Sequence, residues 1–179
     1  MRNQIDKNTV DLFIKAAKEV TATVESVAGN AEALNKALMA ATGEEKVLLS
    51  EPNNIDPELF SVFKSNANVI TDPDKEQLAT VKIGITDAFC GIAATGSVCV
   101  SVAQNLTSPA SMLTGKHIVI VDGRTIVPRP RDVFSDVFLN NKEISKSFTI
   151  ITGPSATADM GPLVRGVHGP GKIHIIILE

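Results

Sequence analysis

The side chains of this chain that could do chemistry gather between residues 152 and 170, in the stretch TGPSATADMGPLVRGVHGP. Gly-Pro occurs there three times, at 153–154, 161–162 and 169–170, and such dipeptides mark tight turns. Polar groups on loops that rigid strands position are the usual layout of a binding site. An ordinary turn-rich connection between two strands is the alternative.

Several groups in this stretch favour a small anion. The stretch follows an apolar run at 148–151, and we expect a helical turn to begin after Ser155. The free N–H groups of such a turn attract negative charge, and the hydroxyls of Thr152, Ser155 and Thr157 add donors. Arg165 supplies a planar guanidinium suited to carboxylate or phosphate. The sequence therefore predicts an anion site, which we expect at the carboxyl end of a sheet.

The imidazole of His168 is the candidate for catalysis, because it can bind or release a proton near neutral pH. We expect it either to hydrogen-bond the ligand or to move a proton. The glycines at 166 and 169 indicate a fixed, crowded backbone around it. In the alternative interpretation, Arg165 pairs with Asp159 and His168 only braces the turn.

A second stretch, Ala94-Thr95-Gly96-Ser97, precedes the apolar run VCVSV. A glycine there lets a ligand or another backbone come close, or simply forms a bend between two core strands. We expect this segment to form a wall beside the converging turns at 153–155 and 166–169. The residues assigned to the ligand site are Thr95, Gly96, Gly153, Ser155, Thr157, Asp159, Arg165, Gly166 and Gly169.

The order of apolar runs and breakers predicts one α/β domain over residues 1–179, with a largely parallel sheet, because strand-like and helix-like segments alternate. The expected helices span 10–18, 30–42, 56–64 and 131–140. The expected strands span 20–25, 46–50, 68–71, 82–86, 89–92, 97–102, 117–121, 148–151 and 173–178. Residues 104–116 are expected to form a loop, and His117 is expected to hydrogen-bond backbone at a strand edge.

Composition excludes several classes of protein. The net charge of −3 gives no basic footprint for nucleic acid, and no run is apolar enough to predict a membrane span. Cys90 and Cys99 form no CxxC pair and have no neighbouring histidines, so we expect no metal, iron, flavin or haem in this chain. We expect both thiols to be reduced and buried in a cytoplasmic protein, on opposite faces of extended chain.

Four segments of the second half make the sequence resemble the LUD domain family, also called lactate utilization protein C or LutC/YkgG-like. They are Ile92–Val100 (IAATGSVCV), His117–Val121 (HIVIV), Gly153–Asp159 (GPSATAD) and Gly166–Pro170 (GVHGP). The resemblance implies a three-layer α/β/α Rossmann-like fold, similar to the glucosamine-phosphate deaminase, ribose-phosphate isomerase and CoA-transferase (NagB/RpiA/CoA-transferase-like) superfamily.

The resemblance also implies a role beside iron–sulfur partner subunits that oxidise L-lactate, and it leaves the oligomeric state open. The chain departs from the family pattern at Ala94, Ala156 and Gly161, where the family usually carries charged residues. Two other functions stay open: a stand-alone enzyme, or a sensor, each binding a phosphorylated, CoA-linked or organic-acid ligand. A transferase with an acyl-glutamate intermediate is disfavoured, because the stretch 152–170 contains no glutamate.

Overall fold

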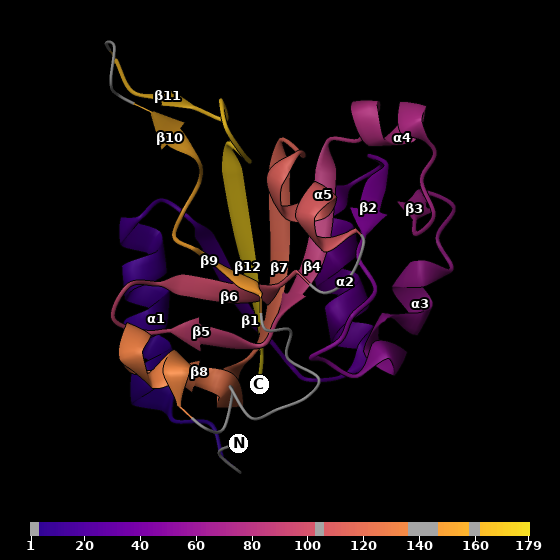
Figure 1. Ribbon diagram of the computed structural model, residues 1–179. Helices are drawn as coiled ribbons and strands as arrows, with labels where there is room; N and C mark the ends of the chain where they lie inside the picture. The colour runs from indigo at the N-terminus through magenta and orange to yellow at the C-terminus, as the bar shows by residue number, and fades with distance from the viewer. Residues whose placement is uncertain (1–3, 103–105, 136–146, 158–161) are drawn as a thin grey trace.

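The computed structural model describes residues 4–102, 106–135, 147–157 and 162–179. Its central element is a sheet of six parallel strands, which runs through the middle of Figure 1. This arrangement confirms the predicted α/β class with a largely parallel sheet. In spatial order the strands are β1 (Thr23–Val27), β12 (Lys172–Leu178), β7 (Lys116–Asp122), β4 (Ile83–Ala88), β2 (Val47–Leu49) and β3 (Val69–Ile70).

One face of this sheet packs against α2 (Ala31–Thr42), the 3-10 helix η1 (Pro57–Phe60) and α3 (Ser61–Lys64). The sequence specifies α2 at both ends. The side chain of Asn30 accepts a hydrogen bond from Ala33 N at 2.9 Å, and Gly43 ends the helix with a φ of 59°. Leu34 and Leu38 lie on the buried side of α2, as the helical spacing predicted.

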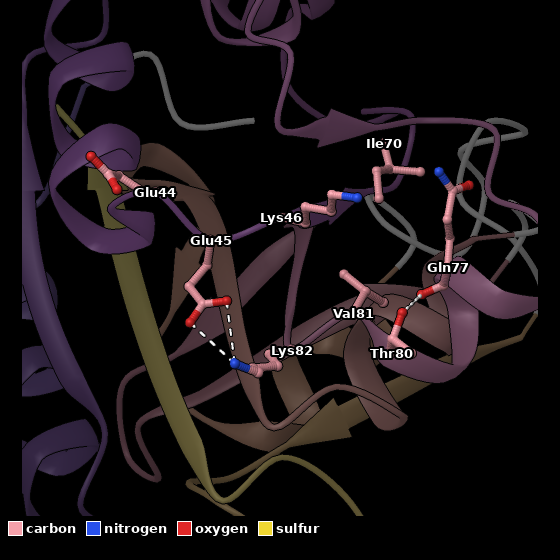
Figure 2. A pocket seen from close by; sticks show the side chains of 8 residues that line it. All are labelled: Glu44, Glu45, Lys46, Ile70, Gln77, Thr80, Val81 and Lys82. Atoms are coloured by element: carbon pink, nitrogen blue, oxygen red, sulfur yellow. Dashed lines mark hydrogen bonds and ion pairs between the residues drawn. The ribbon is translucent and has the colours of Figure 1, made fainter.

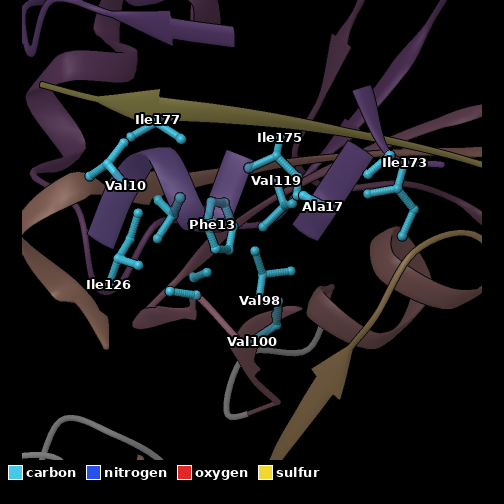
Figure 3. Close-up of a cluster of buried hydrophobic side chains, with 14 residues drawn as sticks. Val10, Phe13, Ala17, Val98, Val100, Val119, Ile126, Ile173, Ile175 and Ile177 are labelled. Atoms are coloured by element: carbon cyan, nitrogen blue, oxygen red, sulfur yellow. The ribbon is translucent and has the colours of Figure 1, made fainter. Parts of the chain in front are cut away.

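The other face carries α1 (Lys7–Glu19), α5 (Thr107–Met112) and a second sheet of four strands. In spatial order that sheet contains β8 (Ile126–Val127), β5 (Cys90–Ile92), β6 (Ser97–Ser101) and β9 (Phe148–Ile151). Figure 3 shows Phe13 of α1 between isoleucines of β12 and the valines Val98 and Val100 of β6. The buried side of helix α1, with Val10, Phe13 and Ala17, therefore packs between the two sheets and completes a layered α/β/α arrangement.

The remaining elements lie around these layers. The 3-10 helix η3 (Pro130–Phe134) covers the outer face of the second sheet through Val133. The short hairpin of β10 (Ala156–Thr157) and β11 (Val164–Arg165) projects beyond the start of β12, at the upper left of Figure 1. Helix α4 (Lys75–Thr80) and the 3-10 helix η2 (Gly123–Thr125) are short connections, and the sequence analysis expected no element at either place.

Three expectations about local structure need correction or fall partly outside the described residues. Residues 107–112 form α5 rather than a loop. The chain after Ser155 forms β10 rather than a helical turn. Of the helix expected over 131–140, the described part is the 3-10 helix η3, and residues 136–140 lie outside the described residues.

The two cysteines do not lie on opposite faces, because Cys90 and Cys99 are direct partners across the antiparallel pair β5–β6. Because the chain reverses direction between the two strands, the alternation of side chains along one strand does not decide which face Cys99 occupies relative to Cys90. Both are free and buried, as expected. The hydrogen bond to the neighbouring Cys99 thiol, and then burial, raise the pKa of the Cys90 thiol.

Candidate functional site

The two turns of the predicted site lie side by side at the root of the β10–β11 hairpin. Ser155 N donates to Pro170 O at 2.9 Å, and Gly166 N donates to Ser155 O at 3.0 Å. A Cβ placed on Gly169 would lie 3.2 Å from the Cβ of Ser155. The structure thus brings Ser155, Gly166 and Gly169 together from separate parts of the stretch.

The third segment adjoins them through a chain of hydroxyl groups. The hydroxyls of Thr95 and Ser97 are 2.6 Å apart, and those of Ser97 and Thr152 are 2.7 Å apart. These three groups partly satisfy one another. The three hydroxyls thus form one hydrogen-bonded chain. Thr157 and Arg165 lie on the β10–β11 hairpin.

Packing against the end of α1 explains why Gly96 and Gly153 are glycines. Gly96 and Gly153 have φ values of 62° and 65°. A Cβ on Gly96 would lie 2.1 Å from Ala17 N, and one on Gly153 would lie 2.4 Å from Val20 O. Both contacts are with backbone at the end of α1, so a side chain at either position would displace the helix. This agrees with the bend between core strands that the sequence analysis left open for Gly96.

The cluster lies at the amino end of the central sheet, because residues 166–170 lead directly into the first residue of β12. The expected position at the carboxyl end was wrong. Free N–H groups were expected after Gly153-Pro154, but the N–H group of Ser155 already donates to Pro170 O. Asp159 lies outside the described residues, so its predicted role stays untested.

The described part of the hairpin region is positively charged. Arg165 and His168 are exposed, and Arg165 forms no ion pair with any described residue. Lys172 is exposed at the start of β12. Burial, and then repulsion from Lys172, lower the pKa of the neighbouring Lys116, whose Nζ donates to Ala41 O at 2.6 Å.

A second polar site, which the sequence analysis missed, lies near the carboxyl ends of β2 and β4. Oδ2 of Asp87 accepts hydrogen bonds from three consecutive backbone N–H groups, those of Asn53, Asn54 and Ile55, at 2.9, 2.5 and 3.0 Å. Asp87 is buried, and burial raises the pKa of its carboxyl group while the hydrogen bonds oppose that rise. The only sequence signal was a charged residue inside an apolar strand.

A third polar site is the seam between α5 and the central sheet. His117 is completely buried, and its Nε2 lies 2.8 Å from the hydroxyl of Thr86. Its Nδ1 has no hydrogen-bond partner among the described residues. Burial lowers the pKa of His117 to about 3. The expectation of a strand-edge histidine bonded to backbone was therefore wrong, because the partner is a side chain in the sheet interior.

Two surface hollows are also present. The first, of about 320 Å³, is at the amino ends of β2 and β4. Figure 2 shows Lys46 extending toward Ile70 within it, and the ion pair of Glu45 and Lys82, 3.3 Å apart, at its side. The second, of about 280 Å³, lies along α1 and includes Ala94. None of the residues assigned to the ligand site lines either hollow.

Within the described ranges, no group of three or more His, Cys, Asp or Glu side chains could hold a metal ion. None of the helices in these ranges is both long enough and apolar enough to cross a bilayer.

The architecture defines a class of protein with a Rossmann-like α/β fold. A solved structure of a DUF162 family protein from Deinococcus radiodurans has this fold, with a TM-score of 0.72, 20% sequence identity, and coverage of 97% of this chain and 98% of that chain. The family model described as LUD domain matches residues 10–178. The chain therefore belongs to the LUD domain family, as its second half predicted.

Curated relatives agree with this assignment. The chain is 28% identical over 182 residues to uncharacterized protein YkgG of Escherichia coli (strain K12), which covers 94% of this chain and 79% of the relative. It is 30% identical to lactate utilization protein C of Bacillus licheniformis over 60% of this chain and 47% of the relative. Lactate utilization protein C of Halalkalibacterium halodurans is 32% identical over 58% of this chain and 47% of the relative. The match thus spans about half the length of the lactate utilization proteins.

Proposed function

We propose that this chain acts in lactate utilization as a component without a redox group of its own, beside iron–sulfur partner subunits. The observation that supports this most is membership of the LUD domain family together with relatives named lactate utilization protein C. In this role the chain contributes contacts and ligand binding, and the partner subunits carry the electrons.

We further propose that the root of the β10–β11 hairpin binds a small carboxylate or phosphate. Arg165, His168 and Lys172 are exposed there, and the described part of residues 147–172 contains no acidic side chain. Arg165 forms no ion pair with the described residues, which leaves its planar donors available for a carboxylate. In this proposal Thr157 and the hydroxyl chain at Thr95 provide further polar surface, and His168 hydrogen-bonds the ligand.

The role in lactate utilization is tested by genetics and by purification. A strain that lacks the gene should grow poorly on L-lactate and normally on glucose, and the intact gene should restore growth. A tagged copy should carry iron–sulfur subunits with it from lactate-grown cells. Normal growth of the deletion strain on lactate would contradict the proposal and would favour a sensor or stand-alone enzyme.

The anion site is tested by ligand-induced stabilisation. Lactate, pyruvate or phosphate at millimolar concentration should raise the Tm of the wild-type protein. Arg165→Ala should weaken that binding by about 1.5–3 kcal/mol, the scale of a hydrogen bond to a charged group, and should leave Tm without ligand almost unchanged, because Arg165 is exposed. Arg131→Ala, at another exposed arginine, is the matched control. If Arg165→Ala binds as tightly as the wild type, Arg165 does not hold the anion.

A further inference from the structure

The loop between β2 and η1 presents three consecutive N–H groups to a single point. Those of Asn53, Asn54 and Ile55 all donate to Oδ2 of Asp87, within 3.0 Å. Successive backbone N–H groups that converge in this way form a nest, a concavity that binds anions such as phosphates and cluster sulfurs in other proteins. Here the anion is a carboxylate from the chain itself, more than thirty residues away.

No cationic side chain of the described residues pairs with this carboxylate. Asp87 is buried, yet it forms no ion pair with any described Lys, Arg or His. The interactions that oppose its burial are the three backbone hydrogen bonds and one from the side chain of Asn54. A buried charge is costly unless it is paired or well hydrogen-bonded. Among the described residues, amide groups alone therefore oppose the effect of burial, which raises the pKa of this carboxyl group.

The position of the nest is the one where an α/β sheet usually binds its ligand. It follows the carboxyl end of β2 and lies beside the carboxyl end of β4. Ligands of open α/β sheets bind outside the carboxyl ends of the strands. The loop is also near solvent, since Glu51 and Asn53 are exposed.

We propose that residues 53–55 form an anion-binding site that Asp87 occupies from within the chain, and that removal of this carboxylate opens the site to a small external carboxylate. The wild-type protein is then blocked at this end of its sheet. This site is separate from the hairpin root, which lies at the amino end, and does not depend on the function proposed above.

The test uses Asp87→Ala and sodium formate, whose carboxylate matches the one removed. The variant should melt below the wild type, and formate should raise its Tm in a saturable way. Formate should also shift the ¹H–¹⁵N signals of Asn53, Asn54 and Ile55 in the variant, with no saturable shift of these signals in the wild type. Sodium chloride at equal ionic strength provides the comparison for general salt effects.

Two further variants keep the test decisive. Asp122→Ala removes another carboxylate at the same end of the sheet. Among the described residues, the Asp122 carboxylate accepts a backbone hydrogen bond only from Arg124 N, so formate should not restore the stability of this variant. Asp87→Asn keeps an oxygen in the nest and should respond weakly to formate. If Asp87→Ala does not fold in plain buffer, its refolding yield should rise in formate and not in chloride.

The outcomes separate the two proposals. The proposal for residues 53–55 would be overturned if Asp87→Ala folds and formate does not shift the three amide signals. It would also be overturned if the variant is unfolded and refolds no better in formate than in chloride. A wild-type response to lactate that disappears in Arg165→Ala and persists in Asp87→Asn concerns the hairpin site alone.

Discussion

The buried imidazole of His117 should make the protein lose stability as the pH falls from 7.5 to 5. The pKa of His117 is lowered from 6.5 to about 3 by burial. Because the folded pKa is depressed, the neutral form contributes stability that is complete above the unfolded pKa and is lost as the pH falls toward the folded one. At pH 5 the unfolded chain has bound this proton almost completely, whereas the folded protein has not.

The magnitude follows from linkage. With an unfolded pKa of 6.5 and a folded pKa of about 3, the loss of unfolding free energy between pH 7.5 and 5 is about 2 kcal/mol. This value depends almost entirely on the unfolded pKa, because any folded pKa well below 5 gives the same result. The figure is therefore insensitive to the depth of the shift.

The assay compares the wild type with His117→Gln, whose amide can still reach the hydroxyl of Thr86 and does not titrate. Urea unfolding is followed by circular dichroism, because the chain has no Trp or Tyr for fluorescence. The wild type should lose about 2 kcal/mol more than the variant between pH 7.5 and 5. His168→Gln, at an exposed histidine, is the control and should retain the wild-type difference.

Equal pH dependence in the wild type and His117→Gln would refute the reasoning, because it would mean that the folded protein protonates His117 as easily as the unfolded chain does. The ring signals of His117 in the folded wild type give an independent check. They should not move between pH 7.5 and 5.

Two further predictions concern packing. Gly84→Ala should destabilise the protein by about 3 kcal/mol or more, because its Cβ would lie 1.9 Å from Ala110 O on α5. The control Gly115→Ala meets nothing closer than 3.6 Å and should change stability little. Equal urea midpoints of the two variants would contradict this prediction. Cys90 and Cys99 should react slowly with a thiol reagent in the native protein and rapidly in urea, because both are buried, and fast native labelling of both would contradict their burial.

The apolar strands were the most predictable part of the fold. Residues 47–49 and 175–178 are buried on both faces, and continuous apolar segments of this kind are typical of parallel sheets. Helix α2 was equally clear, because its cap, periodicity and terminal glycine agree. These features depend on neighbours in the sequence, which is why one sequence was sufficient to place them.

Helix α5 was missed because its buried side is small and polar. Thr107, Ala110 and Ser111 face the sheet, and Gly84 opposite them permits close approach. No large apolar residue marks the helical period, so the segment looks like a loop. The covering helix is specified by a glycine more than twenty residues earlier in the chain, and local patterns do not report such a pairing.

The candidate site was predicted in part. The proximity of the two glycine-rich turns was correct, since each turn flanks an apolar strand. Their position at the amino end was not, because strand order and direction decide which end a turn occupies. The nest around Asp87 was beyond local patterns for the same reason, since its three donors come from a loop that is distant in sequence.

The two ends of the central sheet are therefore unlike in charge and in occupancy. At the carboxyl end, Asp87 already fills the N–H groups of residues 53–55. At the amino end, Arg165 has no ion-pair partner among the described residues, and the exposed Lys172 lowers the pKa of Lys116 by repulsion, after burial. In the two proposals above, the positive charge of the described hairpin region and the satisfied nest at the carboxyl end favour binding of an external anion on the hairpin side. An anion bound at the proposed hairpin site would lie at the end of the sheet opposite to the one that open α/β sheets usually use.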